Sequence, residues 1–588
     1  MSSVRRIAAI AIAAYLLLVL YERFVLIELL ARRVGLPLFL ALVEAVALIG
    51  TGFAARGLFM WGGFSTRPDG LRTRPTWQPA DLDLARELLI GYPIFGAVCF
   101  LAGTLNVSSW SMGAILVAAA AGGAFAIIRR FETRPMQRPA AMESISLIAI
   151  AVVIGCGAIA AQAPPSSLDE LAYHLAVPWT WVKEHFAIDL PLISHSYFPL
   201  GIESADLPLL AILGQAGGIA SHFVHLGAAI ATTALLLRLA RGNALAVAAV
   251  VATPALALTA GWSLVDFPLV GICAALALDE ENGGPAIAAG LLTKYTFAPF
   301  ALIVLIVRRR WRDAIGGAVL GSIFFIRNLF LTGNPLAPFF TDSAPHVAGY
   351  RTAYLSDYVF SGTFVDESLG ASLLAACAMS AGALSWILAG AGILLFFLAP
   401  SARVLIPYFA IPAARSQPPG RVLRALLVIA IAVQLFLVAW FVDRTKYFSL
   451  MSGEASDEQF LARQRPSYST IAALDALLPA ESRTLVVGLN ETFWFARRVR
   501  GGGNFDGPRM SRYLEAPTAE VLYNRLRGDG ITHVAVFAPL PRTTGEAKKI
   551  EERQTELSPA AQRALAQLLD HFAANVATRE RATLFSLR

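Results

Sequence analysis

The sequence predicts a mainly α-helical polytopic membrane protein with about a dozen transmembrane helices and a C-terminal soluble α/β domain. Three observations lead to this prediction. Hydrophobic residues make up 56% of the 588 residues and charged residues only 15%, and the mean hydropathy is +0.60. Apolar runs of the length that crosses a bilayer, about 17 to 25 residues, recur through the first three quarters of the chain. From about residue 443 onward charges occur throughout and no such run remains.

Apolar runs that we expect to form single transmembrane helices lie near 7–30, 36–55, 86–104, 111–128, 144–162, 223–240, 243–262, 313–330, 371–398 and 423–441. The stretch 264–307 is interrupted by Asp279–Gly284 and by Lys294, and we expect about three short spans there. The first run follows Arg5 and Arg6, as in a signal peptide. No small-residue cleavage signal stands out, so we interpret this run as a transmembrane helix.

Arginines in the short loops predict the orientation, because cytoplasmic loops carry an excess of Lys and Arg. Alternating spans place these arginine-bearing segments inside: Arg5–Arg6, Arg56–Arg86, Arg129–Arg138, Arg238–Arg241, Arg308–Arg312 and Arg403–Arg424. The loop at 163–222 and residues 443–588 then face outside, and Arg32–Arg33 is the one violation. The net charge of +7 comes largely from the inside loops, and no aromatic-interleaved basic patch indicates nucleic-acid binding.

Four segments follow from this topology. Residues 1–162 are N-terminal transmembrane helices, 163–222 an external loop with interfacial helices, 223–442 a transmembrane core and 443–588 the external domain. In the loop, Trp179 and Trp181 beside Pro178 are expected to anchor a helix that lies on the membrane surface.

The C-terminal segment alternates helical and strand patterns. Residues 467–480 are expected to form a helix, Thr484–Leu489 and Thr532–Phe537 buried strands, Thr544–Ala574 a helical stretch, and 582–588 a last strand. The alternation predicts a small α/β domain. The Gly-rich stretch Asn490–Arg509 is interpreted as a solvent loop rather than a substrate contact.

The sequence lacks the motifs of several kinds of cofactor, metal and catalytic site. The four cysteines, which lie in or beside apolar runs, are Cys99, Cys156, Cys273 and Cys377. They indicate neither a disulfide framework nor a zinc site, and the histidines show no metal-ligand spacing. There is no P-loop, no G-x-S-x-G and no G-x-G-x-x-G before a helix. We therefore predict no cofactor, while a divalent metal remains open.

The external loop carries an acidic pair where an apolar run leaves the membrane. Asp169 and Glu170 follow Pro164–Pro165, and Ser167-x-x-Glu170 also has the pattern of a capping box. Neighbouring helical residues point about 100° apart, so the two carboxylates are expected to have separate roles. Spacing of four residues pairs Asp169 with Tyr173 and Glu170 with His174. Asp169 is then the better candidate base, and Glu170 the better candidate for a cap or a supporting group.

Four separated segments resemble a known class of membrane enzymes. They are the D-E-x-x-Y-H pattern at Asp169–His174, SYFPLGIESADLPLL beginning at Ser196, GLLTKYTFAP around Lys294, and RNLFLTGNPLAPFF beginning at Arg327. Their order, together with the C-terminal α/β domain, resembles the GT-C-fold glycosyltransferases, the class that includes protein O-mannosyltransferases and lipid A aminoarabinose transferases. The resemblance covers roughly residues 163–588; residues 1–140 lie outside it.

The resemblance implies an inverting glycosyltransferase of the bacterial inner (plasma) membrane, active at the external face in the cell envelope. The donor would be a polyprenyl-phosphate-linked sugar and the acceptor a lipid, a glycan or a protein. Asp169 aligns with the acidic loop residue of the family and would be the general base. The leaving phosphate needs cations, for which Lys294 and Arg327 are the candidates, although Arg327 at a span end could instead reach the interface.

Several other residues of these segments are weaker candidates. His195 could orient the donor phosphate, and Tyr173, His174 and Tyr197 could contact substrate, but Tyr and His are also ordinary residues of a membrane-interface belt. Asp266 could be a second carboxylate or a metal ligand, although helix capping is the more common use of such a residue.

Two other functions stay open. In a lipid or solute transporter, Lys294, Asp266 and Glu44 would be intramembrane charges of a transport path. No inverted pair of broken helices is visible in the sequence, and an external soluble domain has no obvious role in transport. A non-catalytic membrane protein of the same fold is the other alternative.

Overall fold

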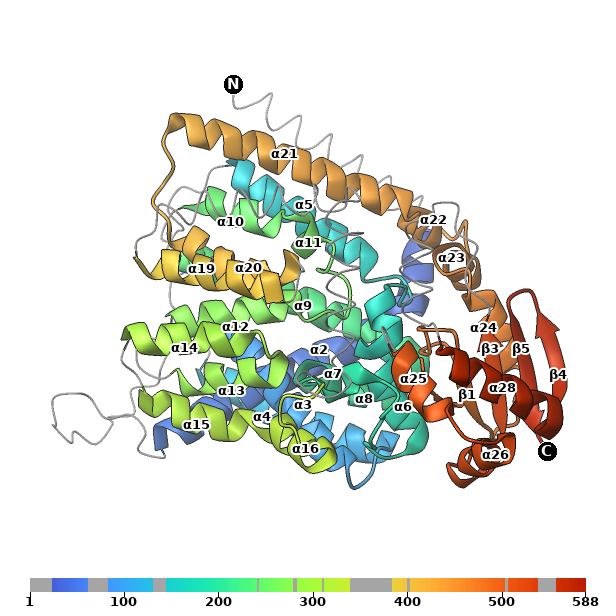
Figure 1. The fold of residues 1–588 in the computed structure, drawn as a ribbon. Helices are drawn as coiled ribbons and strands as arrows, with labels where there is room; N and C mark the ends of the chain where they lie inside the picture. Colours follow the sequence, from blue (N-terminus) through green and yellow to red (C-terminus); the bar gives the residue numbers. More distant parts are fainter. Residues whose placement is uncertain are drawn as a thin grey trace.

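The computed structural model describes residues 24–61, 83–130, 144–240, 243–278, 283–308, 311–338, 383–398, 402–502, 506–537 and 557–588. A large helical bundle carries a small domain with a β-sheet at one end (Figure 1). The bundle has one continuous apolar core, whereas the sheet domain has apolar clusters of its own on its two faces.

The N-terminal half of the bundle consists of α2 (Phe24–Trp61), α3 (Leu84–Gly103), α4 (Ser109–Arg130), α5 (Ser144–Ala160), α9 (Gly217–Leu239), α10 (Ala244–Val251) and α11 (Pro254–Ala257). The C-terminal half consists of α12 (Asp266–Leu278), α13 (Gly284–Thr293), α14 (Phe297–Arg308), α15 (Trp311–Gly321), α16 (Ile323–Thr332), α19 (Ala383–Leu398), α20 (Ala402–Arg415) and α21 (Arg421–Arg444).

Five stretches in the described residues are helical, apolar and long enough to cross a membrane. They are Gly35–Leu58, Leu84–Gly103, Ser109–Ile128, Leu207–Leu239 and Arg421–Arg444, and the pair α15–α16, bent by 51°, would make a sixth. Shorter apolar helices include α12, α13 and α14, which agree with the three short spans expected in 264–307. This confirms a polytopic helical protein, while the predicted run 7–30 falls mostly outside the described residues.

The expected single span at 243–262 is wrong, because the chain breaks into α10 and α11. Thr253 is not helical, with φ −55° and ψ 121°. Pro254 follows it, and a proline clashes with a helical conformation of the residue before it. The sequence beyond α11 then forms turns up to Asp266, where α12 begins.

Placing Arg403–Arg424 in one inside loop is also wrong. Residues 402–415 form α20, with Pro407 and Pro412 inside it, so Arg403 stands at the opposite end of a helix of about 20 Å from Arg415. At the far end, Asn243 donates to Oγ of Ser416 at 2.9 Å. Arg403 therefore lies away from the end of the bundle that carries residues 243 and 416.

Short helices and turns fill the segment between α5 and α9. They are a π-helical turn (Glu170–His174), α6 (Ala176–Glu184), a 3₁₀ turn (Ser194–Tyr197), α7 (Gly201–Ala205), α8 (Leu207–Leu213) and another 3₁₀ turn (Gly214–Ala216). Trp181 is 1% exposed and its Nε1 donates to Ile188 O. The expectation that it anchors a surface helix is therefore wrong.

The C-terminal segment contains α22 (Tyr447–Met451), α23 (Asp457–Gln464), α24 (Tyr468–Asp475), α25 (Gly507–Leu514), α26 (Ala519–Gly528) and α28 (Pro559–Phe572). Its strands are β1 (Arg483–Val487), β2 (Arg498–Arg500), β3 (His533–Phe537), β4 (Ala573–Arg579) and β5 (Ala582–Leu587), in the order β2-β1-β3-β5-β4. β1 pairs in parallel with β2 and β3, and β5 runs antiparallel to β3 and β4.

Side chains alternate across this sheet as strand geometry requires. Leu485 and Val487 of β1 pack in one apolar cluster, which includes residues of α26 and α28. Val486 points to the other face and packs with Ile471 and Leu474 of α24. The predicted helix at 467–480, both predicted buried strands and the last strand are confirmed, and β2 and β4 were not predicted.

The Gly-rich stretch that follows β1 packs against the segment between α5 and α9. Backbone N–H groups of Thr492 and Phe493 donate to Leu171 O at 3.0 and 3.2 Å. Arg509 Nη1 donates to Pro191 O at 2.9 Å. The interpretation of Asn490–Arg509 as a solvent loop is therefore wrong, because this stretch holds the sheet domain against the segment between α5 and α9.

Candidate functional site

Arg403 joins two carboxylates that are distant in the sequence. Its Nε lies 3.1 Å from each carboxylate oxygen of Asp266, and its Nη2 lies 2.5 Å from Oδ2 of the same residue. Its Nη1 lies 2.8 Å from Oδ2 of Asp169. A planar guanidinium suits such two-sided recognition of carboxylates. Asp169 and Asp266 therefore belong to one polar centre.

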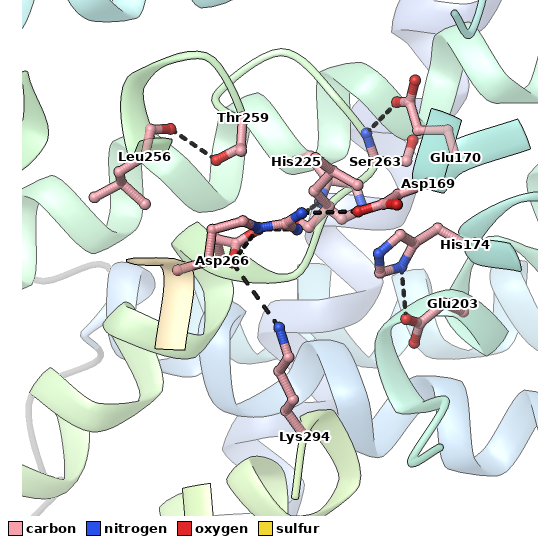
Figure 2. Close-up of polar contacts among 12 residues, drawn as sticks. Asp169, Glu170, His174, Glu203, His225, Leu256, Thr259, Ser263, Asp266 and Lys294 are labelled. Carbon is pink, nitrogen blue, oxygen red and sulfur yellow. Dashed lines mark hydrogen bonds and ion pairs between the residues drawn. The ribbon is translucent and has the colours of Figure 1, made fainter. Parts of the chain in front are cut away.

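Lys294 is the second cation of this centre. Its Nζ lies 4.0 Å from Oδ1 of Asp266, and Figure 2 shows the side chain reaching up toward that carboxylate from below. The centre contains two carboxylates and two cations, so their formal charges balance. Asp266 is 2% exposed, whereas the side chains of Arg403, Lys294 and Asp169 are 23%, 26% and 28% exposed.

Each charged residue of the centre comes from a helix end or a helix break. Asp169 directly precedes the π-helical turn, Asp266 is the first residue of α12, and Arg403 lies in the first turn of α20. Lys294 is extended between α13 and α14, with φ −161° and ψ 141°. Such irregular backbone within an apolar bundle is tolerated where it lines a polar site.

Glu170 points away from Asp169 into a separate set of contacts. Oε1 accepts from Ser263 N at 2.6 Å and lies 2.8 Å from Nε2 of His222, and Oε2 accepts from Ser167 N at 3.0 Å. The last contact is one half of the predicted capping box. Burial raises the pKa of Glu170, but His222 and the two N–H donors outweigh burial and lower it overall. Glu170 is thus an ionised structural carboxylate that ties three segments together.

His174 and Glu203 form a second buried pair. Nδ1 of His174 lies 2.7 Å from Oε1 of Glu203 (Figure 2). Burial raises the pKa of Glu203 to about 8, and burial together with nearby Arg403 and Lys294 lowers the pKa of His174 well below its usual value. At neutral pH Glu203 is therefore protonated and its O–H donates to neutral His174. The geometry places His174 in a structural contact, and its predicted role in substrate binding stays a prediction.

Two of the aromatic and imidazole candidates stack beside the acidic pair. The rings of Tyr173 and His195 are stacked with centroids 4.3 Å apart. Burial lowers the pKa of His195 to about 4, so the imidazole is neutral at pH 7 and can offer a hydrogen bond but no positive charge. His195 would therefore orient a phosphate rather than neutralise it.

Arg327 binds backbone and amide oxygens. Nη2 donates to Ser196 O at 2.6 Å and to Oδ1 of Asn328 at 2.9 Å, and the guanidinium lies over the rings of Phe100 and Phe324. Within the described ranges no carboxylate lies within 4.0 Å of this guanidinium. Its positive charge therefore has no contacting counter-ion in that part of the protein.

The residue that follows Lys294 and the residue that follows Arg327 share one hydrogen-bond acceptor, the backbone oxygen of Tyr197. Tyr295 Oη donates to Tyr197 O at 3.0 Å, and Nδ2 of Asn328 donates to the same oxygen at 2.6 Å. The two predicted cation segments, GLLTKYTFAP and RNLFLTGNP, thus meet at the turn that carries His195. This agrees with one shared site for the quoted sequence segments.

Sequence reasoning missed Arg403, Glu203 and His222. Eleven uncharged residues separate Arg403 from Arg415 in the sequence. That gap is the signal that could have separated it from the loop. Glu203 and His222 lie in apolar surroundings, where an ionisable group is costly enough to be a candidate in its own right.

No metal site emerges from the described residues. Nowhere in these ranges do three or more His, Cys, Asp or Glu side chains converge as ligands. The two carboxylates that do approach each other, Asp169 and Asp266, have the guanidinium of Arg403 between them.

Comparisons with known proteins find a structural likeness only. No family model and no curated protein matches the sequence. The chain is similar to the crystal structure of ArnT from Cupriavidus metallidurans bound to undecaprenyl phosphate, with 12% identity, a TM-score of 0.43, and coverage of 75% of this chain and 97% of that chain. For the apo structure of ArnT the identity and coverage are the same and the TM-score is 0.39. At these values the likeness assigns neither a reaction nor residue roles to this chain.

Proposed function

We propose that this protein is an inverting membrane glycosyltransferase that transfers a sugar from a polyprenyl-phosphate-linked donor to a hydroxyl acceptor. The observation that carries the proposal is the partly exposed carboxylate of Asp169 held beside two cations, Arg403 and Lys294, at breaks in an apolar bundle. A base and a set of cations are what a sugar transfer with a phosphate leaving group needs.

In the proposed reaction the acceptor oxygen attacks the anomeric carbon from the face opposite the phosphate. The bond between that carbon and the phosphate oxygen breaks, and its electron pair stays on the polyprenyl phosphate. Asp169 takes the proton of the acceptor hydroxyl. Arg403, Lys294 and Arg327 are cations that would neutralise the leaving phosphate, and a lipid phosphate delivers its charge at headgroup depth, where such cations can meet it.

We also propose an orientation of the protein in the membrane. Residues 163–222 and 443–588 would face outside, on the periplasmic side of a bacterial inner membrane. In support, arginines expected inside lie together: Arg56 pairs with Glu87, and Arg238 pairs with Asp83. The contacts of Asn243 with Ser416 belong to the same end, whereas Arg403 and Asp169 lie at the other end of α20.

A donor-cleavage assay tests the proposal. Purified full-length protein in nanodiscs is given undecaprenyl-phosphate-linked sugars of several types with a lipid extract as acceptor, and released undecaprenyl phosphate is measured. The wild type should release it, and Asp169→Asn should not. The matched control is Asp570→Asn, the same change at a side chain that is 80% exposed in the sheet domain. No release from any donor, or equal release by Asp169→Asn, would contradict the proposal.

One observation favours transport as a second candidate. Glu44 of α2 is fully buried, and neither carboxylate oxygen has a hydrogen-bond partner among the described residues. The hydroxyl of Tyr92 and Oδ1 of Asp206 are also without such partners in that part of the structure. Buried ionisable groups in membrane helices often mark proton paths. Movement of an uncleaved, fluorescent lipid phosphate across proteoliposomes, abolished by Glu44→Gln, would support transport over sugar transfer.

A further inference from the structure

Arg403 divides its donors unequally between the two carboxylates. Nε and Nη2 form one edge of the guanidinium, and both contact Asp266. Nη1 lies on the other edge and contacts Asp169. Because the first edge makes the larger number of close contacts, Asp266 fixes the position of Arg403. The contact with Asp169 uses the remaining edge.

Burial separates the two contacts in the same way. Asp266 is 2% exposed, so its side of the ion pair is closed to solvent. Asp169 is 28% exposed and Arg403 is 23% exposed, so the junction between Nη1 and Asp169 lies at the open side of the centre. A ligand that enters the centre from its open side meets this junction before it meets Asp266.

The observed ion pair also opposes catalysis by Asp169. Nη1 of Arg403 lies 2.8 Å from Oδ2 of Asp169, so it occupies an oxygen to which an acceptor hydroxyl would have to donate its proton. Oδ2 can accept that proton only when this contact is weakened. The same guanidinium edge can bind a phosphate oxygen. The phosphodiester of the donor offers one charge and two free oxygens, as a carboxylate does, so the two anions can exchange on Nη1.

We propose that Nη1 of Arg403 masks Asp169 in the empty protein and exchanges this carboxylate for the donor phosphate when the donor binds, so that the base is released only in the presence of its substrate. This inference rests on the proposed function and assigns Arg403 a double role in it. Asp266 keeps the guanidinium in place during the exchange. Lys294, 4.0 Å from Asp266, supplies a second positive charge beside that carboxylate. An empty site then has no active base.

The exchange predicts a change in the chemical reactivity of Asp169. A water-soluble carbodiimide modifies accessible carboxyl groups through their protonated form. Full-length protein in nanodiscs is treated at pH 6 with and without undecaprenyl phosphate, and modification of Asp169 is measured by peptide mass spectrometry relative to exposed Asp443. Binding of the lipid phosphate is measured separately by thermal shift. Undecaprenol, which lacks the phosphate, and inorganic phosphate are the ligand controls.

We expect undecaprenyl phosphate to increase modification of Asp169 by roughly tenfold, because the carboxylate loses one hydrogen bond to a charged group and becomes accessible to the reagent. Undecaprenol should have no effect. Inorganic phosphate at millimolar concentration tests whether the phosphate alone suffices. Arg403→Gln should show high modification without ligand and no further rise, and Glu170, which is buried and held by His222, should stay unmodified throughout.

The outcomes separate the inference from the function on which it rests. Proven binding of undecaprenyl phosphate with unchanged or reduced modification of Asp169 in the wild type overturns the exchange and leaves the proposed function intact. Absence of binding overturns the proposed function as well. Because the wild-type measurement decides by itself, the inference stays testable even where Arg403→Gln fails to fold.

Discussion

Both carboxylate oxygens of Asp506 lie 3.1 Å from the backbone N–H of Ser194 and accept from it. This contact joins the sheet domain to the 3₁₀ turn that carries His195. Asp506 is 4% exposed, and burial raises its pKa from 3.8 to about 7, although the bond from Ser194 and the nearby Arg509 act against this. Above neutral pH the carboxylate is therefore ionised while it is buried in the interface, and this buried charge costs stability.

The first prediction concerns the pH dependence of this interface. A raised pKa means that the folded protein binds the proton more tightly than the unfolded chain, so stability is lost as the pH rises from about 4 to about 7. Relative to Asp506→Asn, which does not titrate, the wild type should lose up to roughly 4 kcal/mol over this window. Apparent Tm values across pH 4–8 test it, with Asp570→Asn as the exposed control. Parallel curves for the wild type and Asp506→Asn would refute it.

The second prediction concerns Glu203 and His174. At neutral pH the protonated Glu203 donates to Nδ1 of His174, and the amide N–H of Glu203→Gln can do the same, so the variant should fold with a stability within about 1 kcal/mol of the wild type at pH 5. The pKa of Glu203 is raised to about 8. The wild type should therefore lose stability relative to the variant from about pH 4.5 to pH 8 and none beyond.

Thermal unfolding between pH 5 and pH 9 measures this difference. Glu520→Gln, at an exposed position of α26, is the matched control and should track the wild type at every pH. A stability gap between Glu203→Gln and the wild type that does not change with pH would show that Glu203 is ionised throughout.

The third prediction separates the two neighbouring carboxylates. Asp169→Asn should lower turnover at least about 100-fold, because a general base contributes on that order and an amide cannot accept the proton. Binding of undecaprenyl phosphate should be kept. Glu170→Gln should instead lower stability by roughly 3 kcal/mol, since it breaks the buried pair with His222. Its specific activity per folded molecule should stay close to that of the wild type, and the reverse pattern would exchange the assigned roles.

The fourth prediction concerns the phosphate-binding cations. Lys294→Ala should weaken the binding of both the donor and free undecaprenyl phosphate, because it removes a charge from the centre. Arg327→Lys should also impair activity, because an ammonium cannot reproduce the planar fork that reaches Ser196 O and Asn328. Ligand-induced thermal shifts on folded variants measure this. Shifts equal to that of the wild type in both would limit these residues to a structural role.

The fifth prediction concerns orientation. In a background without the four native cysteines, cysteines introduced at Asp189 and Ser456, both exposed, should react with an impermeant maleimide in intact cells. A cysteine at exposed Gln417, beyond the other end of α20, should react only after the cells are opened. Labelling of Asp189 and Gln417 from the same side would invalidate the arrangement.

Sequence reasoning predicted the parts of the protein that depend on local patterns. Apolar runs predicted the long helices, and alternating patterns predicted β1, β3 and β5. The divergent directions of Asp169 and Glu170 are confirmed by their separate partners, Arg403 and His222.

Features that depend on tertiary contacts could not be predicted in this way. Arg403 resembles any loop arginine until α20 brings it to Asp169. The two strands that were missed are a three-residue strand and the exposed edge strand β4, whose apolar alternation is weak. In the docking of the Gly-rich stretch, the side chains of Arg509 and Asp506 contact backbone groups of the other segment, so no matching pair of side chains indicates the docking in the sequence.

The π-helical turn that follows Asp169 contains a surplus residue. Leu175 N donates to Glu170 O, five residues earlier, so the turn holds one residue more than an α-helix would. Because the surplus residue is contained within this one turn, side chains inside the turn point in directions that a regular α-helix does not offer. Glu170 and His174, at the two ends of the turn, reach different buried partners, His222 and Glu203. Removing one residue between them would restore an ordinary helical turn, and it should therefore misplace these two contacts while leaving the course of α6 intact.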